Sequence, residues 1–400
     1  MKFILLACGL AASLGLGPQQ ANAQTPTLAE AVESTWQRAV ASREVNGQLQ
    51  RASAELELAR SYWPASPSLE VSHRDDRLQS KRGVRESEIG LAMPLWLPGQ
   101  RDARTQAAQA DLDASAAARV AGRLRVSGAV RDAAWNAAMQ RADLELARER
   151  WRVLDKLAAD VSRRVQAGEL ARADGMAARA ELLAAAAAVR QATQSLQASM
   201  QSWAALTGLA TVPAAAEPTT VPEPEEHPYL AAARLQLEAA RRRADAVGAS
   251  RVAAPELVAR LRQDVGGRNE PASNSFGVAV RIPLGAAERN RPLVVAALAE
   301  VETAEAAYMQ QRDQLRADLA TARSALASAE EQLRDEKERA DLLIERASLL
   351  DKSFAAGESA LPEALRALSA AQEAQAAVRR QEIALGLARA RVLQAQGITP

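Results

Sequence analysis

Few side chains in this sequence have the type and spacing needed for metal binding or acid–base catalysis. The chain has 2 histidines, His73 and His227, in different segments, and its 1 cysteine, Cys8, lies in a leader-like N-terminal stretch. Soft-metal sites are built from imidazole and thiolate ligands, so we expect no dedicated site of that kind. There is no nucleophile elbow, phosphate-binding glycine loop, zinc-protease helix or pair of catalytic carboxylates. We therefore expect neither an enzyme nor a bound cofactor.

Glycines and carboxylates gather instead where two long helical stretches are predicted to end. Gly168 and Gly357 lie at these ends, where a glycine accepts positive φ and lets the chain reverse. After Gly357, Pro362 and Glu363 are start signals for a returning helix, because proline fits the first turn and a carboxylate there suits the helix dipole. The pattern predicts two helix–turn–helix corners with tips at about residues 166–171 and 355–360.

The composition is typical of long, thin helices in an exported protein. Apolar residues make up 48% of the 400 residues, but aromatic residues only 3%, and the net charge of +1 gives no sign of a nucleic-acid partner. Residues 1–23 resemble a secretory signal peptide with cleavage before Gln24, although the stretch "LLAC" leaves lipidation at Cys8 as an alternative. No later stretch has the roughly 18 consecutive apolar residues of a membrane-spanning helix.

The chain is an internal duplication. Three matches recur at one spacing of 189 residues: Met93–Leu95 with Ile282–Leu284, Ala167–Glu169 with Ala356–Glu358, and Gly208 with Gly397. We predict a first repeat at residues 24–208 and a second at 229–400. The Pro- and Glu-rich residues 209–228 between them are expected to form an extended connector whose carboxylates are solvated: Glu217, Glu223, Glu225 and Glu226.

Each repeat is predicted to contain one very long helix. In the second repeat, steps of three and four join Ala322, Leu326, Ala329, Leu333, Glu336, Ala340, Leu343, Ala347, Leu350 and Phe354. The first repeat has the same stripe at Leu144, Ala147, Trp151, Leu154, Ala158, Val161 and Val165. A helix from Arg101 to Ala167 would be about 100 Å long. Few compact domains have that length.

Four segments alternate apolar and polar residues with the two-residue period of a β-sheet. They lie at about residues 67–78, 84–95, 255–265 and 273–284. Their lengths suit the apolar band of an outer-membrane barrel, which four strands cannot close. The chain must therefore oligomerise if the strands cross a membrane, with eight strands from two subunits or twelve from three. Hairpins that cap a soluble helical rod are the alternative.

These features resemble the TolC-like outer-membrane factors of tripartite efflux pumps, and more closely the CzcC-like branch found with heavy-metal resistance systems. The resemblance rests on the duplicated unit, on "MPLWLPGQRDARTQAAQADL" and "HPYLAAARLQLEAA", and on the tips "RRVQAGELARADGMAARAELL" and "FAAGESALPEALRA". It implies a mainly helical fold with membrane strands, in which a homotrimer forms a twelve-stranded barrel in the Gram-negative outer membrane and an α-helical tunnel through the periplasm. It also implies a periplasmic membrane-fusion adaptor and an inner-membrane pump of the resistance-nodulation-division (RND) class as partners, with outer-membrane lipid around the barrel.

The resemblance assigns roles to specific positions. The adaptor is expected to contact the two tips at Gly168, Glu169, Leu170, Gly357, Glu358 and Ser359. Asp174 and Glu363 are candidates for a periplasmic gate, because threefold symmetry would turn each into a ring of carboxylates that favours cations; a solvated surface charge is the alternative for both. Gly99, Arg101 and Arg104 are expected at the junction of barrel and tunnel, either holding neighbouring groups or exposed in the first helical turn.

The implied function is passive export. Heavy-metal cations are the favoured cargo, because the motif "PGQRDAR" is similar to the metal-efflux branch. Export of organic drugs is the second reading, and an exported coiled-coil scaffold is the alternative from a different class of protein.

Overall fold

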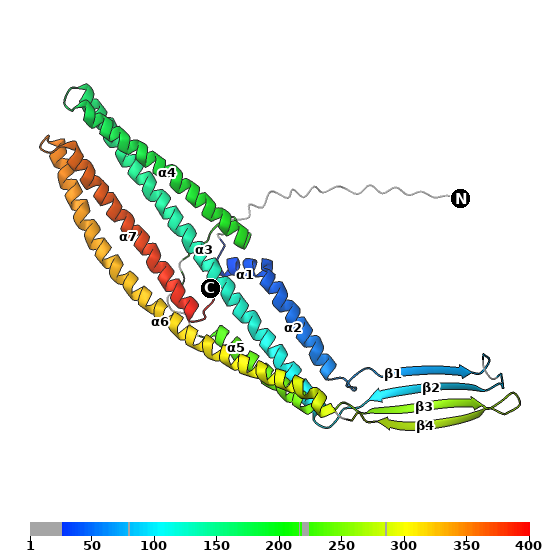
Figure 1. Cartoon of the computed structure of the whole chain (residues 1–400). Coiled ribbons are helices and arrows are strands. Elements are labelled where there is room, and N and C mark those ends of the chain that lie inside the picture. The colour runs from blue at the N-terminus through cyan, green and yellow to red at the C-terminus, as the bar shows by residue number, and fades with distance from the viewer. Residues whose placement is uncertain (1–25, 79–80, 216, 218–223, 285) are drawn as a thin grey trace, which may run out of the picture.

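The computed structural model describes residues 26–78, 81–215, 217, 224–284 and 286–400, so the predicted signal peptide and Cys8 lie outside the described residues. A short antiparallel sheet forms one end of the molecule, and two long helical hairpins run away from it (Figure 1). The elements in chain order are α1 (Leu28–Arg38), α2 (Val40–Ala59), β1 (Ser68–Asp75), β2 (Arg85–Pro94), α3 (Gln100–Gln166), α4 (Arg172–Thr207), α5 (Pro228–Ala249), β3 (Glu256–Val265), β4 (Ser273–Arg281), α6 (Ala286–Ala355) and α7 (Leu361–Ala395).

The four strands form one antiparallel sheet in the order β1-β2-β3-β4. The register places apolar residues opposite one another on one face, in rows such as Leu69–Leu91–Ala259–Val278 and Val71–Ile89–Leu261–Phe276. The other face carries rows such as Glu70–Gly90–Arg260–Gly277. The apolar face is uncovered in the single chain, since Val71 and Phe276 are each 69% exposed. Within the described chain β1 and β4 each have one unpaired edge.

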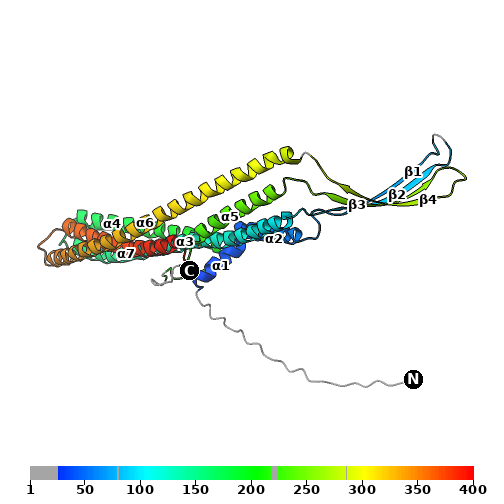
Figure 2. The ribbon, with the colours of Figure 1, turned by 90° about the horizontal axis from the view of Figure 1, so that it is seen from below.

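The helices continue the sheet as a layer of the same order. Next to the sheet, α3 packs against α2 and α5, and α5 packs against α6. Farther away, α3 packs against α4 and α7, and α7 packs against α6 (Figures 1 and 2). One side of the layer is therefore formed by β1, α2 and α4, and the other by β4 and α6. These two sides are not covered by any other described part of the chain.

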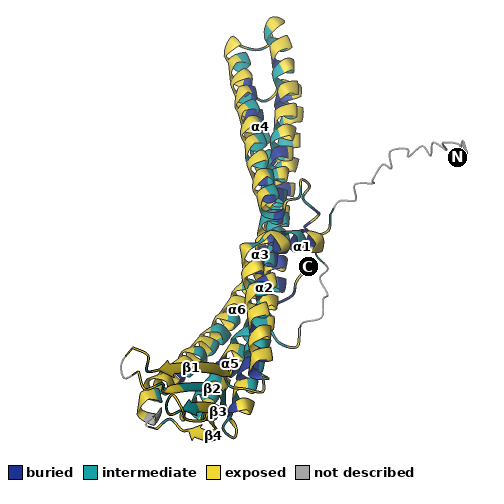
Figure 3. Cartoon of the chain, turned by 90° about the vertical axis from the view of Figure 1, so that its right-hand side faces the viewer, coloured by how far each residue is buried: buried dark blue, intermediate teal, exposed yellow. Residues whose placement is uncertain are grey.

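The heptad pattern explains why α3 and α6 can be 67 and 70 residues long. Every position of the predicted α6 stripe is buried or half-buried, while the residues around it are mostly exposed. Figure 3 shows that exposed residues prevail on the outside of the helical layer. On α3, Leu144, Leu154 and Val161 of the predicted stripe are buried. Trp151, which was predicted to be part of the same stripe, is the exception. Its side chain is 39% exposed, whereas Leu154 and Val161 lie in the core of the hairpins.

Close helix packing near the middle of the layer depends on small residues. A Cβ atom at Gly386 of α7 would collide with the ring of Trp135 of α3, and one at Gly122 would press on Trp36 of α1. The rings of these tryptophans occupy the space that a side chain would need, so the helices can approach closely.

The predicted fold class, a mainly helical chain with a small antiparallel sheet, is confirmed. The trimeric barrel belongs to an assembly and stays a prediction. Among the described residues, no helix has both the length and the apolar character needed to cross a membrane.

Candidate functional site

The two hairpin tips have the same backbone geometry. Gly168 and Gly357 have φ of 82° and 79°, in the left-handed region. At the first tip the amide of Glu169 donates to the carbonyl of Arg164 at 2.9 Å, and at the second the amide of Glu358 donates to Ser353 at 2.9 Å. This is the Schellman end of a helix, which satisfies terminal carbonyls and reverses the chain. A glycine is needed for its backbone conformation alone, because no atom lies within 4 Å of a Cβ built at either position.

Four of the six predicted tip contacts are exposed, namely both glycines with Glu169 and Glu358. The other two are engaged within their own hairpins. Leu170 packs against the apolar cluster that holds Leu154 and Val161, and the hydroxyl of Ser359 donates to the carbonyl of Leu350 at 3.5 Å. The exposed backbone and the two carboxylates are thus the parts of the tips that a partner could reach.

The two predicted gate residues occupy the same place in successive hairpins, the third residue of the returning helix. Asp174 is half-buried, and its carboxylate accepts a hydrogen bond from the amide of Ala171 at 3.3 Å. Glu363 is exposed at the start of α7. A carboxylate in the first turn stabilises a helix through its dipole, so both positions have a local structural role.

The junction residues tie the start of α3 to the segment between α2 and β1. Gly99 precedes α3 with φ of 80°. The guanidinium of Arg101 donates to the carbonyl of Arg60, and that of Arg104 donates to the carbonyl of Pro64 at 3.4 Å. Arg104 also lies over the ring of Trp96, 5.8 Å from its centroid.

Sequence reasoning missed Gln100, the polar residue that joins the two repeats at this level. It is 5% exposed, and its amide nitrogen donates to the carbonyls of Ala249 and Val252 at 3.2 and 3.1 Å. Asn290 at the start of α6 donates to Ser250 and Arg251 in the same connection. Gln100 stands inside the motif "PGQR", but a sequence motif does not say which of its members will be buried.

A second missed site lies at mid-length, where the connector meets α3 and α7. The expectation that Glu217 is solvated was wrong. Its carboxylate forms a bidentate ion pair with the buried guanidinium of Arg131, at 2.8 and 2.7 Å, and the two side chains are 8% and 2% exposed. Arg131 also donates to Ser127 and to Gln394. Glu226 also has a partner, because its carboxylate forms an ion pair with Arg234 at 3.0 Å. Glu223 lies outside the described residues.

His227 lies at the end of the same connector. Its Nδ1 accepts the amide of Tyr229 at 3.1 Å and so caps the N-terminus of α5. Burial lowers the pKa of the imidazole below 6.5, partly opposed by the backbone of Gln394 and the charge of Asp318. The neutral ring is the form that can accept this hydrogen bond.

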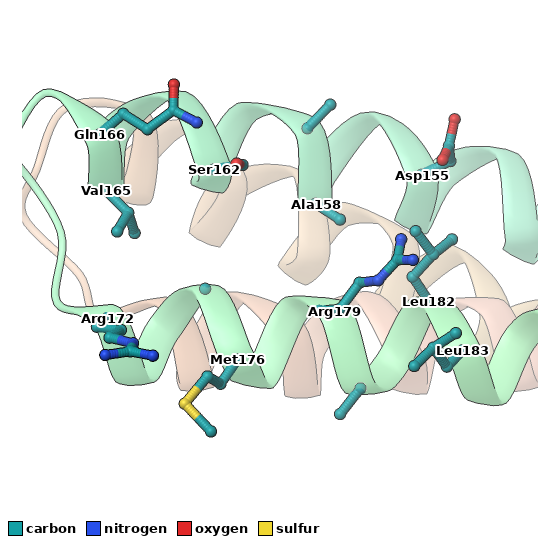
Figure 4. A pocket seen from close by; sticks show the side chains of 13 residues that line it. Asp155, Ala158, Ser162, Val165, Gln166, Arg172, Met176, Arg179, Leu182 and Leu183 are labelled. Atoms are coloured by element: carbon teal, nitrogen blue, oxygen red, sulfur yellow. The ribbon is translucent and has the colours of Figure 1, made fainter.

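Two grooves flank the hairpins near their tips. The first has a volume of about 850 Å³ and lies between α3 and α4, with Met176, Arg179 and Leu183 along one wall (Figure 4). The second, of about 1240 Å³, lies between α3 and the α6–α7 hairpin. In the described part of the chain, no group of three or more His, Cys, Asp or Glu side chains is arranged to hold a metal ion.

Comparison with known proteins supports the family resemblance. Residues 224–397 match the family described as outer membrane efflux protein. The cobalt-zinc-cadmium resistance protein CzcC of Cupriavidus metallidurans is 27% identical over 277 residues, which cover 65% of this chain and 64% of that protein. The chain therefore matches just under two thirds of this relative's length.

Solved structures extend the likeness to nearly the whole fold. The outer membrane protein VceC of Vibrio cholerae superposes with a TM-score of 0.75 at 17% identity, covering 93% of this chain and 96% of that one. The MtrE outer membrane channel of Neisseria gonorrhoeae, in its open state, gives a TM-score of 0.72 at 17% identity, covering 93% and 89%. The predicted resemblance to TolC-like outer-membrane efflux proteins is confirmed, and the chain has the fold of these outer-membrane channels.

Proposed function

We propose that this chain is the outer-membrane channel subunit of a tripartite efflux system and serves as a passive conduit from the periplasm to the exterior. One observation carries the proposal: a sheet whose one face is apolar over the half next to the helices continues directly into helices about 100 Å long. An apolar sheet face suits lipid, and the helices have the length to reach across a periplasm.

The assembly we propose is a homotrimer. Membrane strands must pair along every edge, because an unpaired backbone group in lipid costs several kcal/mol. The free edges belong to β1 and β4, which run antiparallel to each other in the sheet order. Pairing β4 of one copy with β1 of the next therefore extends one antiparallel sheet, and three copies give twelve strands around a lumen that larger barrels keep open.

The tips are proposed to contact a periplasmic membrane-fusion adaptor, which in turn binds an RND pump in the inner membrane. The exposed residues Gly168, Glu169, Gly357 and Glu358 are the candidate contacts. Asp174 and Glu363, in the first turn of the returning helices, remain the candidates for a carboxylate gate.

Heavy-metal cations are the cargo that we propose. Similarity to a cobalt-zinc-cadmium resistance protein and the motif that contains Gln100, Arg101 and Arg104 support this choice. Organic drugs are the second candidate cargo, because the likeness to outer-membrane channels such as VceC and MtrE concerns the fold and does not select a cargo.

Complementation tests the function and the cargo together. The chain is expressed together with a periplasmic membrane-fusion adaptor and an RND pump, in a Gram-negative strain without its own channel. Growth is measured with cobalt, zinc or cadmium and, separately, with an organic dye. If growth is restored with the metals but not with the dye, the result supports metal export. If growth is restored with the dye but not with the metals, the cargo is an organic compound. Recovery of the protein in the soluble periplasm without detergent would contradict the conduit and favour the scaffold.

The adaptor contact has its own test. Gly357→Pro removes both the positive φ and an amide of the tip, so we expect resistance to be lost while trimers remain on a native gel. Loss of the trimers would mean that the tip acts in assembly and not in adaptor binding.

A further inference from the structure

Positive charge is concentrated at the end of the sheet that lies away from the helices, here called the outer end. Residues 74–85 and 265–272, which include both hairpin turns, contain six basic and three acidic residues, a net charge of +3. The whole chain has a net charge of only +1. The two turns lie side by side at this end (Figures 1 and 2). One end of the molecule is therefore much more basic than the chain as a whole.

The two acidic residues of the first turn are engaged within it. The carboxylate of Asp76 accepts hydrogen bonds from the amides of Arg82 and Gly83 at 2.7 and 3.0 Å. The carboxylate of Asp75 forms an ion pair with Arg77 at 3.4 Å. These carboxylates therefore hold the turn and the one arginine beside it, and they leave the other basic side chains of the outer end unpaired.

Five cations of the outer end are exposed, and none of them is within ion-pair distance of a carboxylate in the described chain: Arg74, Lys81, Arg82, Arg85 and Arg268. The arginines inside β3 and β4 differ, because each has an acidic partner on the polar face of the sheet. These pairs are Arg260 with Glu88, Arg262 with Glu86, and Arg281 with Glu256. Within the sheet and its turns, the cations without a partner thus gather at the outer end.

A contact between the two repeats makes two of these cations neighbours. The amide of Arg268 donates to the carbonyl of Arg82 at 3.1 Å. Gly83 has φ of 90° and allows this approach, because a Cβ atom there would lie 2.7 Å from Cγ and 3.0 Å from the amide nitrogen of Arg268. The backbone therefore holds two arginines together although neither has a carboxylate partner. An anion that binds both would offset their mutual repulsion.

The apolar face of the sheet changes in character toward these cations. Beyond the row that holds Val71 and Phe276 lies the row His73–Ser87–Gln263–Asn274, which is polar, and Nδ1 of His73 lies 2.9 Å from Oγ of Ser87. The next row contains Arg85. Two rows are four residues, about 14 Å along a strand, or about 10 Å of depth at the tilt of a membrane barrel. This depth is comparable to that of a lipid headgroup layer.

We propose that the outer end of the sheet binds the phosphate groups of anionic lipids in the outer leaflet of the membrane. Arg82, Arg85 and Arg268 bind the phosphates, and the polar row below them hydrogen-bonds the rest of the headgroup. The proposal rests on the membrane-embedded sheet proposed above. It goes beyond the contact of lipid chains with the apolar face, because it names a charged site and the chemical group that this site takes.

The chemistry and the position of the site both favour a lipid phosphate. A guanidinium can donate two parallel hydrogen bonds to a phosphate group, which gives arginine an advantage over lysine at such sites. Arg85 lies on the same face as the apolar rows, so an anion bound there lies directly above the lipid chains. Basic clusters beside a membrane surface attract anionic headgroups, and each cation increases the affinity about fivefold.

Lipid binding by the full chain, purified in a neutral detergent, tests this site. Affinity is measured for three fluorescent probes in the micelles: lipid A, lipid A without its phosphates, and phosphatidylcholine. We expect the native protein to bind lipid A most tightly. Arg82→Gln combined with Arg268→Gln should weaken this binding about 25-fold, while the corresponding double change to lysine should weaken it less. The matched control, Arg119→Gln with Arg148→Gln, removes two exposed charges from α3 and should bind as the native protein does.

Several results would overturn the site. These are equal lipid A affinity in the glutamine variant and the α3 control, equal affinity of the native protein for the phosphate-free probe, or displacement of lipid A by millimolar inorganic phosphate at constant ionic strength. Unboiled gels check that each variant keeps its folded oligomer, and the comparison of probes on the native protein does not depend on any variant.

Resistance is assayed separately, so that failure of this site and failure of the proposed function can be told apart. A native protein that prefers lipid A but restores no resistance would leave the site standing and overturn the export function. Restored resistance without a preference for lipid A would overturn the site alone.

Discussion

The ion pair between Arg131 and Glu217 is the most buried charged contact in the described chain. It holds the connector between repeats against α3, and Gln394 of α7 completes the same hydrogen-bond network. Removing one partner of a buried pair leaves an uncompensated charge in a low-dielectric site, which is more costly than never having had the pair.

Glu217→Gln should therefore lower the free energy of unfolding by about 3–5 kcal/mol, because the guanidinium of Arg131 stays buried without its carboxylate. The midpoint of urea unfolding in detergent measures this. Glu225→Gln is the matched control: it is an exposed residue of the same connector and should change stability by no more than about 0.5 kcal/mol. Equal midpoints for the two variants would contradict the role given to Glu217.

His227 predicts a pH dependence. Burial lowers the pKa of its imidazole below 6.5, so the unfolded chain takes up a proton before the folded chain does. The stability that the neutral imidazole contributes is fully present above pH 6.5. It is lost as the pH falls through the lowered pKa of the folded chain. His227→Asn keeps an N-cap that does not titrate. Between about pH 7.5 and pH 5 the Tm should fall less for this variant than for the native chain, and parallel Tm curves would exclude His227 as the source.

At the scale of the elements, the tip turns depend on backbone conformation and not on space. Asparagine tolerates positive φ better than other residues with side chains, whereas a β-branched residue does not. Gly357→Asn should keep the turn, and Gly357→Val should destabilise it by about 1–2 kcal/mol. Hydrogen exchange of the Glu358 amide, which donates to Ser353 in the turn, reports this directly. Equal exchange in both variants would mean that the turn does not need the left-handed conformation.

The long helices were predictable because their signals are periodic and occur twice. The stripe from Ala322 to Phe354 is buried or half-buried at every position, and Gly168 and Gly357 adopt the positive φ that their place at the helix ends suggested. The apolar period indicates which face of a helix is covered, and the duplicated sequence gives this indication twice.

Single polar residues were harder to predict, because their burial depends on contacts between distant segments. Gln100 is held by carbonyls about 150 residues away, and Glu217 meets Arg131 86 residues away. Trp151 shows the opposite limit: it fits the heptad, yet its side chain is exposed on the single chain. A local pattern cannot tell a residue covered within the chain from one left for a partner.

At the scale of the whole molecule, the chain is a layer with two uncovered sides and one uncovered sheet face. The homotrimer proposed above would pair these two sides between neighbouring copies. The apolar sheet face needs a different partner. Copies that pair through β1 and β4 would lie beside the sheet and would leave its face uncovered. Lipid is the partner that such a face suits, while the opposite face, with Arg260 paired to Glu88 at 3.3 Å, suits a wet lumen.

Two adjacent residues of β4 separate these environments. Val278 lies on the apolar face opposite Ala259, and Ala279 lies on the other face opposite Val258. Val278→Arg places a charge among lipid chains and should destabilise the inserted protein by about 2–4 kcal/mol, whereas Ala279→Arg can extend its charge into water. We expect the Val278 variant to lose most of the folded oligomer in outer-membrane fractions, seen as the band that persists in unboiled gels, and the Ala279 variant to keep it. If both variants insert equally, the apolar face does not contact lipid, and the soluble rod becomes the better description of this molecule.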